Sequence, residues 1–411
     1  CKCAVLEICV DGALLSYKGL QAASDSCLYH YKRASTASTI CKTDGILSMQ
    51  VSIHPFTGWL INKHIIFSDD NAYVTTAISI ASLITENLLS HPFIVLRRQC
   101  QVHNSLKNYH IVPYTLLPVV ARLHRRQDVT TLWKGIGSTC IVKGLNLAVE
   151  DVVAKGTGWP KRLRSNDYTK RSSINSISFS VSLAIITPFY SASLVETVQS
   201  DIASDKPALF DVFREGFMRI LEWGTPSRGR MLPIWAIVLP TVALGISKYL
   251  AQKITAKVLR FQQRHRHEMS DSYNMNYSKT SNPLIEDINL KANIFSFITM
   301  EIIFYPIETI IHRLQIQGTR TIIDNLDSGV SVTPILTGYE GFMDCYNTTI
   351  AKEGVAGLYK GFGALVLQLA AHLAIIKLTT LVVSEVTNLL KPAKSPNSED
   401  SVHSQQKYLF N

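Results

Sequence analysis

Two short strings, Tyr359-Lys360-Gly361-Phe362-Gly363 and Trp133-Lys134-Gly135-Ile136-Gly137, match closely, and each opens a long apolar segment. Each string also follows an earlier apolar segment that contains a proline, Pro306 in one case and Pro92 in the other. A third proline, Pro188, lies between them inside a further apolar segment. Because repetition at this scale is typical of chains built from repeated helical units, the sequence predicts three units of two helices each.

Six apolar segments approach or exceed the length of about 20 residues that is needed to cross the hydrocarbon core of a bilayer. They are residues 72–91, 136–154, 174–198, 231–250, 292–311 and 362–383. We therefore predict an all-α, six-transmembrane-helix bundle of three two-helix repeats with pseudo-three-fold symmetry. The alternative is a soluble helical protein with buried core helices, which is disfavoured because such segments seldom recur so often.

The predicted membrane domain covers residues 72–391, with repeats at about 72–155, 172–262 and 287–391. Residues 263–285 are rich in polar side chains and are expected to form a long loop between the fourth and fifth spans. That loop would separate the second repeat from the third.

The two terminal segments lack the pattern of a packed domain. Residues 1–70 are expected to be poorly ordered or an artefact of the gene model, because they show no clear period and the first methionine is Met49. Residues 392–411 are rich in Ser, Asn and Gln, so we expect a disordered tail.

The formal net charge is +10, and much of the basic excess lies between the apolar segments, at residues 161–171 and 253–266. Basic clusters beside a bilayer attract anionic head groups, although ordinary solvated loops carry such charges too. The lipid bilayer is therefore an expected partner. Nucleic acid is not, because no DNA- or RNA-binding motif accompanies these charges.

Sites for metal binding and catalysis are not evident in the sequence. Five of the eight cysteines lie in the first 41 residues without the paired spacing of a zinc site, and we expect free thiols. His267-Glu268 lacks the second histidine of a zinc-protease motif, and Gly135-Ile136-Gly137 lacks the third glycine of a dinucleotide loop. We therefore predict no catalytic residues, no metal and no cofactor.

The third unit contains a two-part motif, in which Pro306, Glu308 and Arg313 are followed by Glu353-Gly354 and then by Tyr359-Lys360-Gly361. On these residues the chain resembles the mitochondrial carrier family, solute carrier family 25, over about residues 72–391. That family repeats P-x-[DE]-x-x-[KR]-x-[KR] and then [DE]-G-x4-[FYW]-[KR]-G three times, and the first two units here are partial copies. The resemblance assigns structural-signature roles to Pro92, Arg97, Pro188, Pro306, Glu308, Arg313, Glu353, Gly354, Tyr359, Lys360 and Gly361.

Residues 91–102, 188–194 and 312–325 resemble a divergent branch of this family that resides in the outer mitochondrial membrane. This resemblance implies a multi-pass protein of that membrane with roles in the balance of mitochondrial fusion and fission, in cristae organisation and in lipid traffic at organelle contacts. It also implies mitochondrial fusion GTPases and the cristae-organising complex as partners. The oligomeric state stays open.

The gate positions of the family signature are mostly uncharged here. In the family, each acid of the signature pairs with the base of a neighbouring repeat, and this ring of ion pairs must form and break during transport. The acid positions of this chain hold Ile94, Tyr190 and Glu308, and the base positions hold Arg97, Ser193 and Ile311. We predict that Arg97 and Glu308 form one structural ion pair.

Other features of a transporter are also missing. The motif [FY]-[DE]-x-x-[KR], which ends the even-numbered helices of working carriers, is absent from residues 136–155, 231–260 and 362–391, and Val142 and Gln368 occupy two positions that are often basic. Lone charges remain within the apolar segments, among them Lys143, Glu196 and Glu301, where charge is costly and often functional, although ion pairs or helix-end positions also explain it.

These patterns favour an adaptor without solute transport, and the alternative is a genuine transporter of a metabolite or lipid. A candidate partner surface follows the fifth span, where Gly318, Arg320, Asp324 and Asn325 are expected to be exposed. A plain helix-capping loop is the competing interpretation of that segment.

Overall fold

The computed structural model describes residues 72–156, 168–201, 210–221, 230–273 and 282–390. The terminal segments predicted at 1–70 and 392–411 lie outside these described residues.

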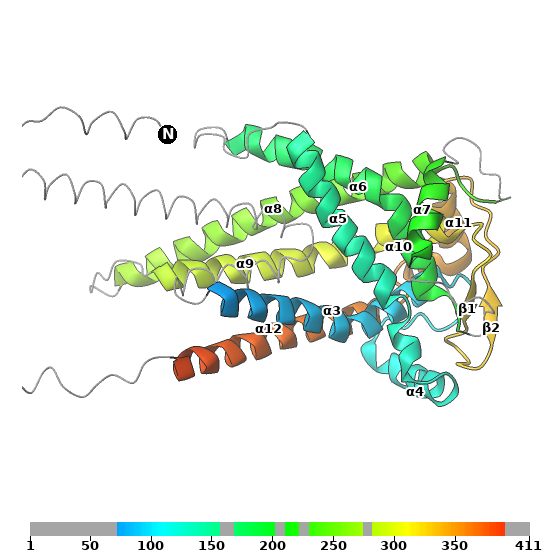
Figure 1. The fold of residues 1–411 in the computed structure, drawn as a ribbon, viewed down its shortest axis with the longest axis horizontal. Coiled ribbons are helices and arrows are strands. Elements are labelled where there is room, and N and C mark those ends of the chain that lie inside the picture. Colours follow the sequence, from blue (N-terminus) through cyan, green and yellow to red (C-terminus); the bar gives the residue numbers. More distant parts are fainter. Residues whose placement is uncertain (1–71, 157–167, 202–209, 222–229, 274–281, 391–411) are drawn as a thin grey trace, which may run out of the picture.

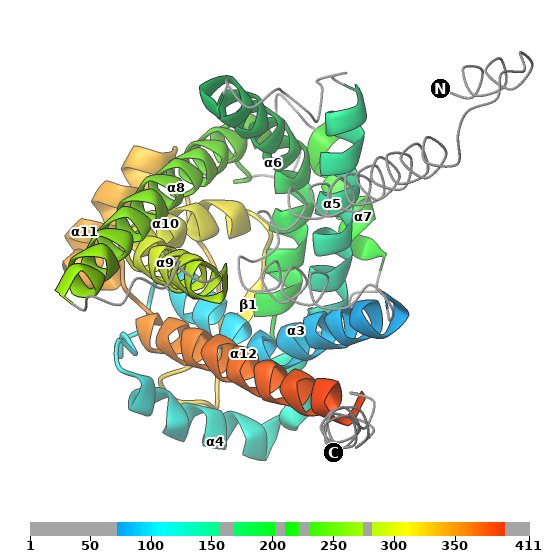
Figure 2. The same cartoon turned by 90° about the vertical axis from the view of Figure 1, so that its left-hand side faces the viewer.

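Long helices make up most of the described chain, and Figure 2 shows them arranged in a ring when the bundle is viewed nearly end-on. They are α3 (Ala72–Val102), α5 (Ile136–Gly156), α6 (Tyr168–Val198), α8 (Ile234–Tyr273), α9 (Asn282–Ile303), which continues into α10 (Tyr305–Ile316), and α12 (Phe362–Leu390). Helix α12 packs against α3, α5 against α6, and α8 against both α6 and α9. Helices from all three predicted repeats therefore contribute to one bundle.

Shorter elements gather at one end of the bundle, on the right-hand side of Figure 1. They are η1 (Pro113–Leu116), α4 (Leu117–Arg126), η2 (Val129–Trp133), α7 (Asp211–Leu221), β1 (Ile322–Asp324), β2 (Val332–Pro334) and α11 (Phe342–Gly357). The two strands form an antiparallel hairpin between α10 and α11. The signature prolines lie toward this end, in the last third of α3 and of α6 and in the first turn of α10.

By length and apolar composition, two stretches of the described helices qualify as membrane spans, Ser176–Val198 in α6 and Ile234–Arg266 in α8. Two bent helix pairs also qualify if each pair is one span: Lys291–Ile303 with Tyr305–Ile316, bent by 58°, and Phe342–Gly357 with Phe362–Ile375, bent by 60°. This criterion gives two to four spans in the described chain. The number six stays a prediction.

The prediction of a polar loop at residues 263–285 is wrong over residues 263–273 and 282–285, because α8 continues to Tyr273 and α9 begins at Asn282. Residues 263–273 contain neither glycine nor proline, so nothing in the backbone chemistry ends the helix there. Helix α9 then begins at Asn282, with Pro283 in its first turn, where a missing N–H costs nothing.

The signature prolines act differently in the three units. Pro92 and Pro188 lie inside the continuous helices α3 and α6, whereas Pro306 lies in the first turn of α10, directly after the 58° bend that ends α9. A proline lacks the N–H that would bond back to the preceding turn, so a helix breaks or bends most easily next to it. The third unit is therefore the one in which the described helix is interrupted.

Gly318, directly after α10, provides a test of the packing at this end. Its φ is +78°, and a Cβ at this position would lie 2.5 Å from the backbone nitrogen of Met231. Gly318→Ala should therefore destabilise the protein by at least about 2 kcal/mol, since both the left-handed conformation and overpacking carry penalties of this order. The measurement is the unfolding free energy of the purified protein in detergent.

Gly338→Ala is the matched control, because a Cβ at Gly338 would meet nothing closer than 3.8 Å. We expect a change within about 0.5 kcal/mol, as for most surface substitutions. Equal effects of the two alanines would show that the close approach at Gly318 is not important.

Candidate functional site

Four charged side chains meet between α3, α8, α9 and α10, and we call Arg97, Lys248, Glu301 and Glu308 the central cluster. Arg97 donates through Nη2 to Glu308 Oε1, and its Nη1 lies 3.7 Å from Glu301 Oε2. Lys248 Nζ lies 3.0 Å from Glu301 Oε1 and 3.0 Å from Glu308 Oε2. The structure therefore brings Arg97 and Glu308 together, and it adds a second base and a second acid.

The central cluster is balanced, with two cations and two carboxylates, and its side chains are only 10–22% exposed. A charge removed from water is costly unless an opposite charge and hydrogen bonds compensate it. Gln368 Oε1, on α12, accepts a further hydrogen bond of 3.1 Å from Arg97 Nη1. The cluster thereby joins α3 to helices of the second and third repeats.

Helix α6 does not take part in the central cluster. Tyr190, at an acid position of the signature, accepts a 3.1 Å hydrogen bond from Arg98, and its hydroxyl lies 3.2 Å from His312 Nε2. Ser193, at a base position, lies 3.3 Å from the hydroxyl of Ser138. Uncharged side chains thus occupy the positions at which α6 of a three-pair ring would supply charge.

A second buried network joins the two halves of the signature in the third unit. Arg313 forms a two-pronged pair with Glu353, at 2.9 Å and 2.8 Å, and Lys360 Nζ lies 2.8 Å from the same carboxylate. The side chains of Arg313 and Lys360 are 1% and 0% exposed. Lys360 also donates to the backbone carbonyls of His103 and Asn104. This network fixes α10, α11 and the start of α12 to the end of α3.

The aromatic and glycine residues of the same motif shape the turn before α12. Tyr359 stacks on Tyr305, whose hydroxyl donates a 2.7 Å hydrogen bond to the carbonyl of Lys360. Gly354 and Gly361 have φ values of +70° and +78°. Gly361 also approaches Cys100 so closely that a Cβ would lie 2.6 Å away, so only glycine fits there.

The partner surface predicted after α10 is wrong for Asp324. Arg320 is exposed and Gly318 and Asn325 are half-buried, but Asp324 is 2% exposed and its carboxylate lies 2.9 Å from Lys134 Nζ. Because β1 folds back onto the bundle, this acid faces protein rather than solvent. It cannot serve as a docking residue in this conformation.

Burial alone would raise the pKa of Asp324. The charge of Lys134 and the hydrogen bonds from Ser200 and Gln127 outweigh burial and hold the pKa below its ordinary value. An acid whose pKa falls on folding stabilises the native state at pH values above its unfolded pKa. That stabilisation is lost only as the pH drops through the lowered value, so Asp324 stays ionised at neutral and mildly acidic pH.

Sequence reasoning missed the partners of these acids. Lys248 and Glu301 were visible only as single charges inside apolar segments, and their pairing depends on which faces of α8 and α9 meet. Lys134 was visible only as part of the repeated string that begins at Trp133. A lone charge in an apolar segment is the one signal that could have indicated the central cluster.

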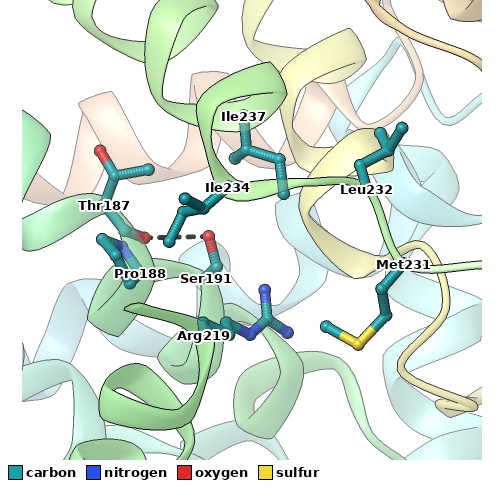
Figure 3. Close-up of a pocket in the computed structure, with 8 residues that line it drawn as sticks. All are labelled: Thr187, Pro188, Ser191, Arg219, Met231, Leu232, Ile234 and Ile237. Atoms are coloured by element: carbon teal, nitrogen blue, oxygen red, sulfur yellow. Dashed lines mark hydrogen bonds between the residues drawn. The ribbon is translucent and has the colours of Figure 1, made fainter. Parts of the chain in front are cut away.

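A small pocket lies beside the bundle core between α6, α7 and the start of α8 (Figure 3). Its lining is apolar apart from Thr187, Ser191 and Arg219, and Ser191 donates a 2.9 Å hydrogen bond to the carbonyl of Thr187. Arg219 donates to the carbonyl of Gln315 at 3.3 Å, which ties α7 to α10. Among the described residues, no three His, Cys, Asp or Glu side chains form a group that could hold a metal ion.

Comparison with known proteins identifies the family of this chain. A family profile described as "Mitochondrial carrier protein" matches residues 289–387. Over 317 residues the chain is 41% identical to "Mitochondrial outer membrane protein SLC25A46" of Gallus gallus, a match that covers 76% of this chain and 77% of the relative. The protein of the same name from Homo sapiens is 38% identical over 319 residues, with 76% and 75% covered.

A third relative, "Solute carrier family 25 member 46-A" of Xenopus laevis, is 40% identical over 318 residues, which cover 77% of this chain and 76% of the relative. Each of these matches covers about three quarters of this chain, whereas the family profile matches residues 289–387, within the third unit. The chain is therefore a multi-pass protein of the mitochondrial outer membrane, similar to proteins named SLC25A46, and it belongs to the mitochondrial carrier family.

Proposed function

We propose that this chain is an adaptor of the carrier fold in the mitochondrial outer membrane and that it does not transport solutes. The observation that supports this most directly is the composition of the central cluster. Its charges come from α3, α8, α9 and α10, while α6 supplies Tyr190 and Ser193 at the signature positions. In the ring of the family every repeat supplies an acid and a base from its signature helix, and α6 of this chain supplies neither.

The proposal includes the six-helix, three-repeat arrangement with pseudo-three-fold symmetry. The ring of long helices in Figure 2 supports it, as do the related strings that open α5 and α12. In this arrangement α9 and α10 together form one bent span.

The resemblance suggests the cellular role. We propose that the adaptor acts in the balance of fusion and fission, in cristae organisation and in lipid traffic at organelle contacts, with mitochondrial fusion GTPases and the cristae-organising complex as partners. The buried networks support a scaffold, because Arg313, Glu353 and Lys360 hold three helices in one arrangement. We also propose that the protein has no catalytic activity.

The alternative is a transporter of a metabolite or lipid whose contacts differ from those of ordinary carriers. One observation favours it: the side chains of Lys248 and Glu301 keep 22% and 16% exposure, so the central cluster is reachable by a polar molecule. Transport would also require the buried contacts at the closed end to break and reform.

Reconstitution into phospholipid vesicles tests the two functions. We expect no saturable counter-exchange of carboxylates, nucleotides or phospholipids, because the positions that should form the opening ring are neutral on α6. The measurement is the uptake of labelled solute into vesicles preloaded with the same solute. A transporting member of the same family, inserted in parallel, shows that the vesicles are sealed and competent. Saturable exchange that depends on this protein would overturn the adaptor proposal.

A further inference from the structure

The β1–β2 hairpin lies across the end of the bundle at which the signature prolines gather (Figure 1). In its register, Ile322 pairs with Pro334, Ile323 with Thr333 and Asp324 with Val332. The hairpin belongs to the third unit in the sequence, since it follows α10 directly. Its contacts, however, are largely with the other two units.

The backbone of the hairpin joins the second unit directly after α6. Gln199 forms an antiparallel bridge with Ile323, and the N–H of Ser200 donates a 2.8 Å hydrogen bond to the carbonyl of Ile322. These bonds extend the hairpin by a short third segment. The outer side of β1 is therefore occupied by chain from another repeat.

Asp324 collects polar groups from two repeats around one buried carboxylate. Its Oδ2 lies 2.9 Å from Lys134 Nζ at the start of α5 and 3.4 Å from Gln99 Nε2 on α3. Its Oδ1 accepts hydrogen bonds of 2.5 Å from Ser200 and 3.0 Å from Gln127. Groups from both helices of the first unit and from the end of α6 thus converge on an acid of the third unit.

The tip of the hairpin is attached to the first unit. Asp327 accepts hydrogen bonds of 2.8 Å and 2.9 Å from the backbone N–H groups of Lys107 and Asn108, and Arg126 donates to the carbonyl of Val330 at 2.8 Å. Leu326, which is fully buried, packs in one apolar cluster with Cys100 and other residues of the first unit. Hydrogen bonds and apolar packing therefore both hold the tip of the hairpin against the first unit.

We propose that the β1–β2 hairpin is a strap that holds the three repeats together at this end of the bundle, with Asp324 as its latch. A carrier exposes its centre to this side by separating the three repeats, and here separation would require these contacts to break together. Breaking a buried, hydrogen-bonded ion pair leaves an uncompensated charge, which is strongly unfavourable. The inference deepens the proposed function and rests on it, because a permanently closed end suits a scaffold that does not exchange solutes.

Cys100 reports whether the strap lies in place, because it is 0% exposed and belongs to the same apolar cluster as Leu326 of the hairpin. We expect Asp324→Asn in the full-length protein to increase the rate of Cys100 alkylation by about tenfold or more, since local opening controls the access of reagents to buried groups. The measurement is site-resolved thiol labelling followed by peptide mass spectrometry. Cys345, buried in a separate cluster with Ile310 and Leu314, should keep its rate.

Asp201→Asn is the matched control, because this acid is exposed and follows Ser200 directly, so its substitution should leave both rates unchanged. Lys134→Met provides a second variant that keeps the test available if Asp324→Asn does not fold. In that variant Asp324 retains hydrogen bonds from Ser200, Gln127 and Gln99, and we expect a smaller increase at Cys100 alone.

Unchanged labelling of Cys100 in the latch variants would overturn the strap. Equal acceleration at Cys100 and Cys345 would overturn it too, since that result means general loosening of the fold. The two proposals fail separately. Counter-exchange by the wild-type protein would remove the proposed function, whereas the labelling rates decide only whether the hairpin holds this end closed.

Discussion

Glu353→Ala is expected to lower the unfolding free energy by about 3–5 kcal/mol, the usual cost of removing one partner from a buried ion pair. The substitution leaves the guanidinium of Arg313 and the ammonium of Lys360 close together, each at most 1% exposed, without their shared carboxylate. Lys360 would keep its contacts with the carbonyls of His103 and Asn104 and with the ring of Tyr109, none of which carries a negative charge. Denaturant unfolding of the purified protein in detergent measures the change.

Lys352→Ala is the control for this result, because Lys352 is an exposed neighbour on the same helix and its loss should change stability by less than about 0.5 kcal/mol. Glu353→Gln separates charge from shape, since the amide keeps the size of the side chain and loses its charge. We expect Glu353→Gln to lie between the alanine variant and the wild type. If Glu353→Ala were as stable as Lys352→Ala, the network would have no structural importance.

The starts of two helices, α5 and α12, could be predicted because local chemistry sets them. The segments expected to begin at residues 136 and 362 begin there as α5 and α12. Each follows a glycine with positive φ, Gly135 at +66° and Gly361 at +78°, which ends the preceding turn. A repeated Lys-Gly string is therefore a boundary signal that a single sequence contains.

The hairpin could not be predicted, because the contacts that order it are distant in sequence. Strands of three residues give almost no periodic signal, and the polar run around Asp324 is equally typical of an exposed loop. Only the folded chain shows that Lys134 and Ser200 lie beside this acid. A buried polar residue is invisible in sequence until its partner is known.

The central cluster was predictable for two of its four residues only. Arg97 and Glu308 occupy signature positions, so the resemblance indicated their pairing, and the structure places them in contact. Lys248 and Glu301 lie on helices whose facing sides depend on the packing of α8 against α9. No local pattern specifies that packing.

Glu308→Gln is expected to cost about 3 kcal/mol or more, because Arg97 and Lys248 would then share the single carboxylate of Glu301 in a poorly solvated site. Glu340→Gln, which removes an exposed carboxylate, should change stability by less than about 0.5 kcal/mol and serves as the control. Both variants are compared by denaturant unfolding in detergent.

The double variant Arg97→Gln with Glu308→Gln distinguishes a structural pair from two independent residues. It leaves one cation, Lys248, and one carboxylate, Glu301, so the cluster is neutral again. The double variant should therefore be more stable than the sum of the two single effects predicts, by about 1–3 kcal/mol, as for residues in direct contact. Additive effects would mean that the pair of Arg97 and Glu308 is unimportant.

The same variants also separate a scaffold from a gate. In a gate, weakening the pair of Arg97 and Glu308 favours the open state and so raises exchange across vesicles, because only a few kcal/mol divide the two states. In a scaffold, Glu308→Gln lowers stability and produces no exchange, since the strap contacts of Asp324 still hold the repeats together. We expect the second result, with flux through Glu308→Gln vesicles equal to that through empty vesicles. Flux that rises as the cluster is weakened would show that these four charges still work as a gate.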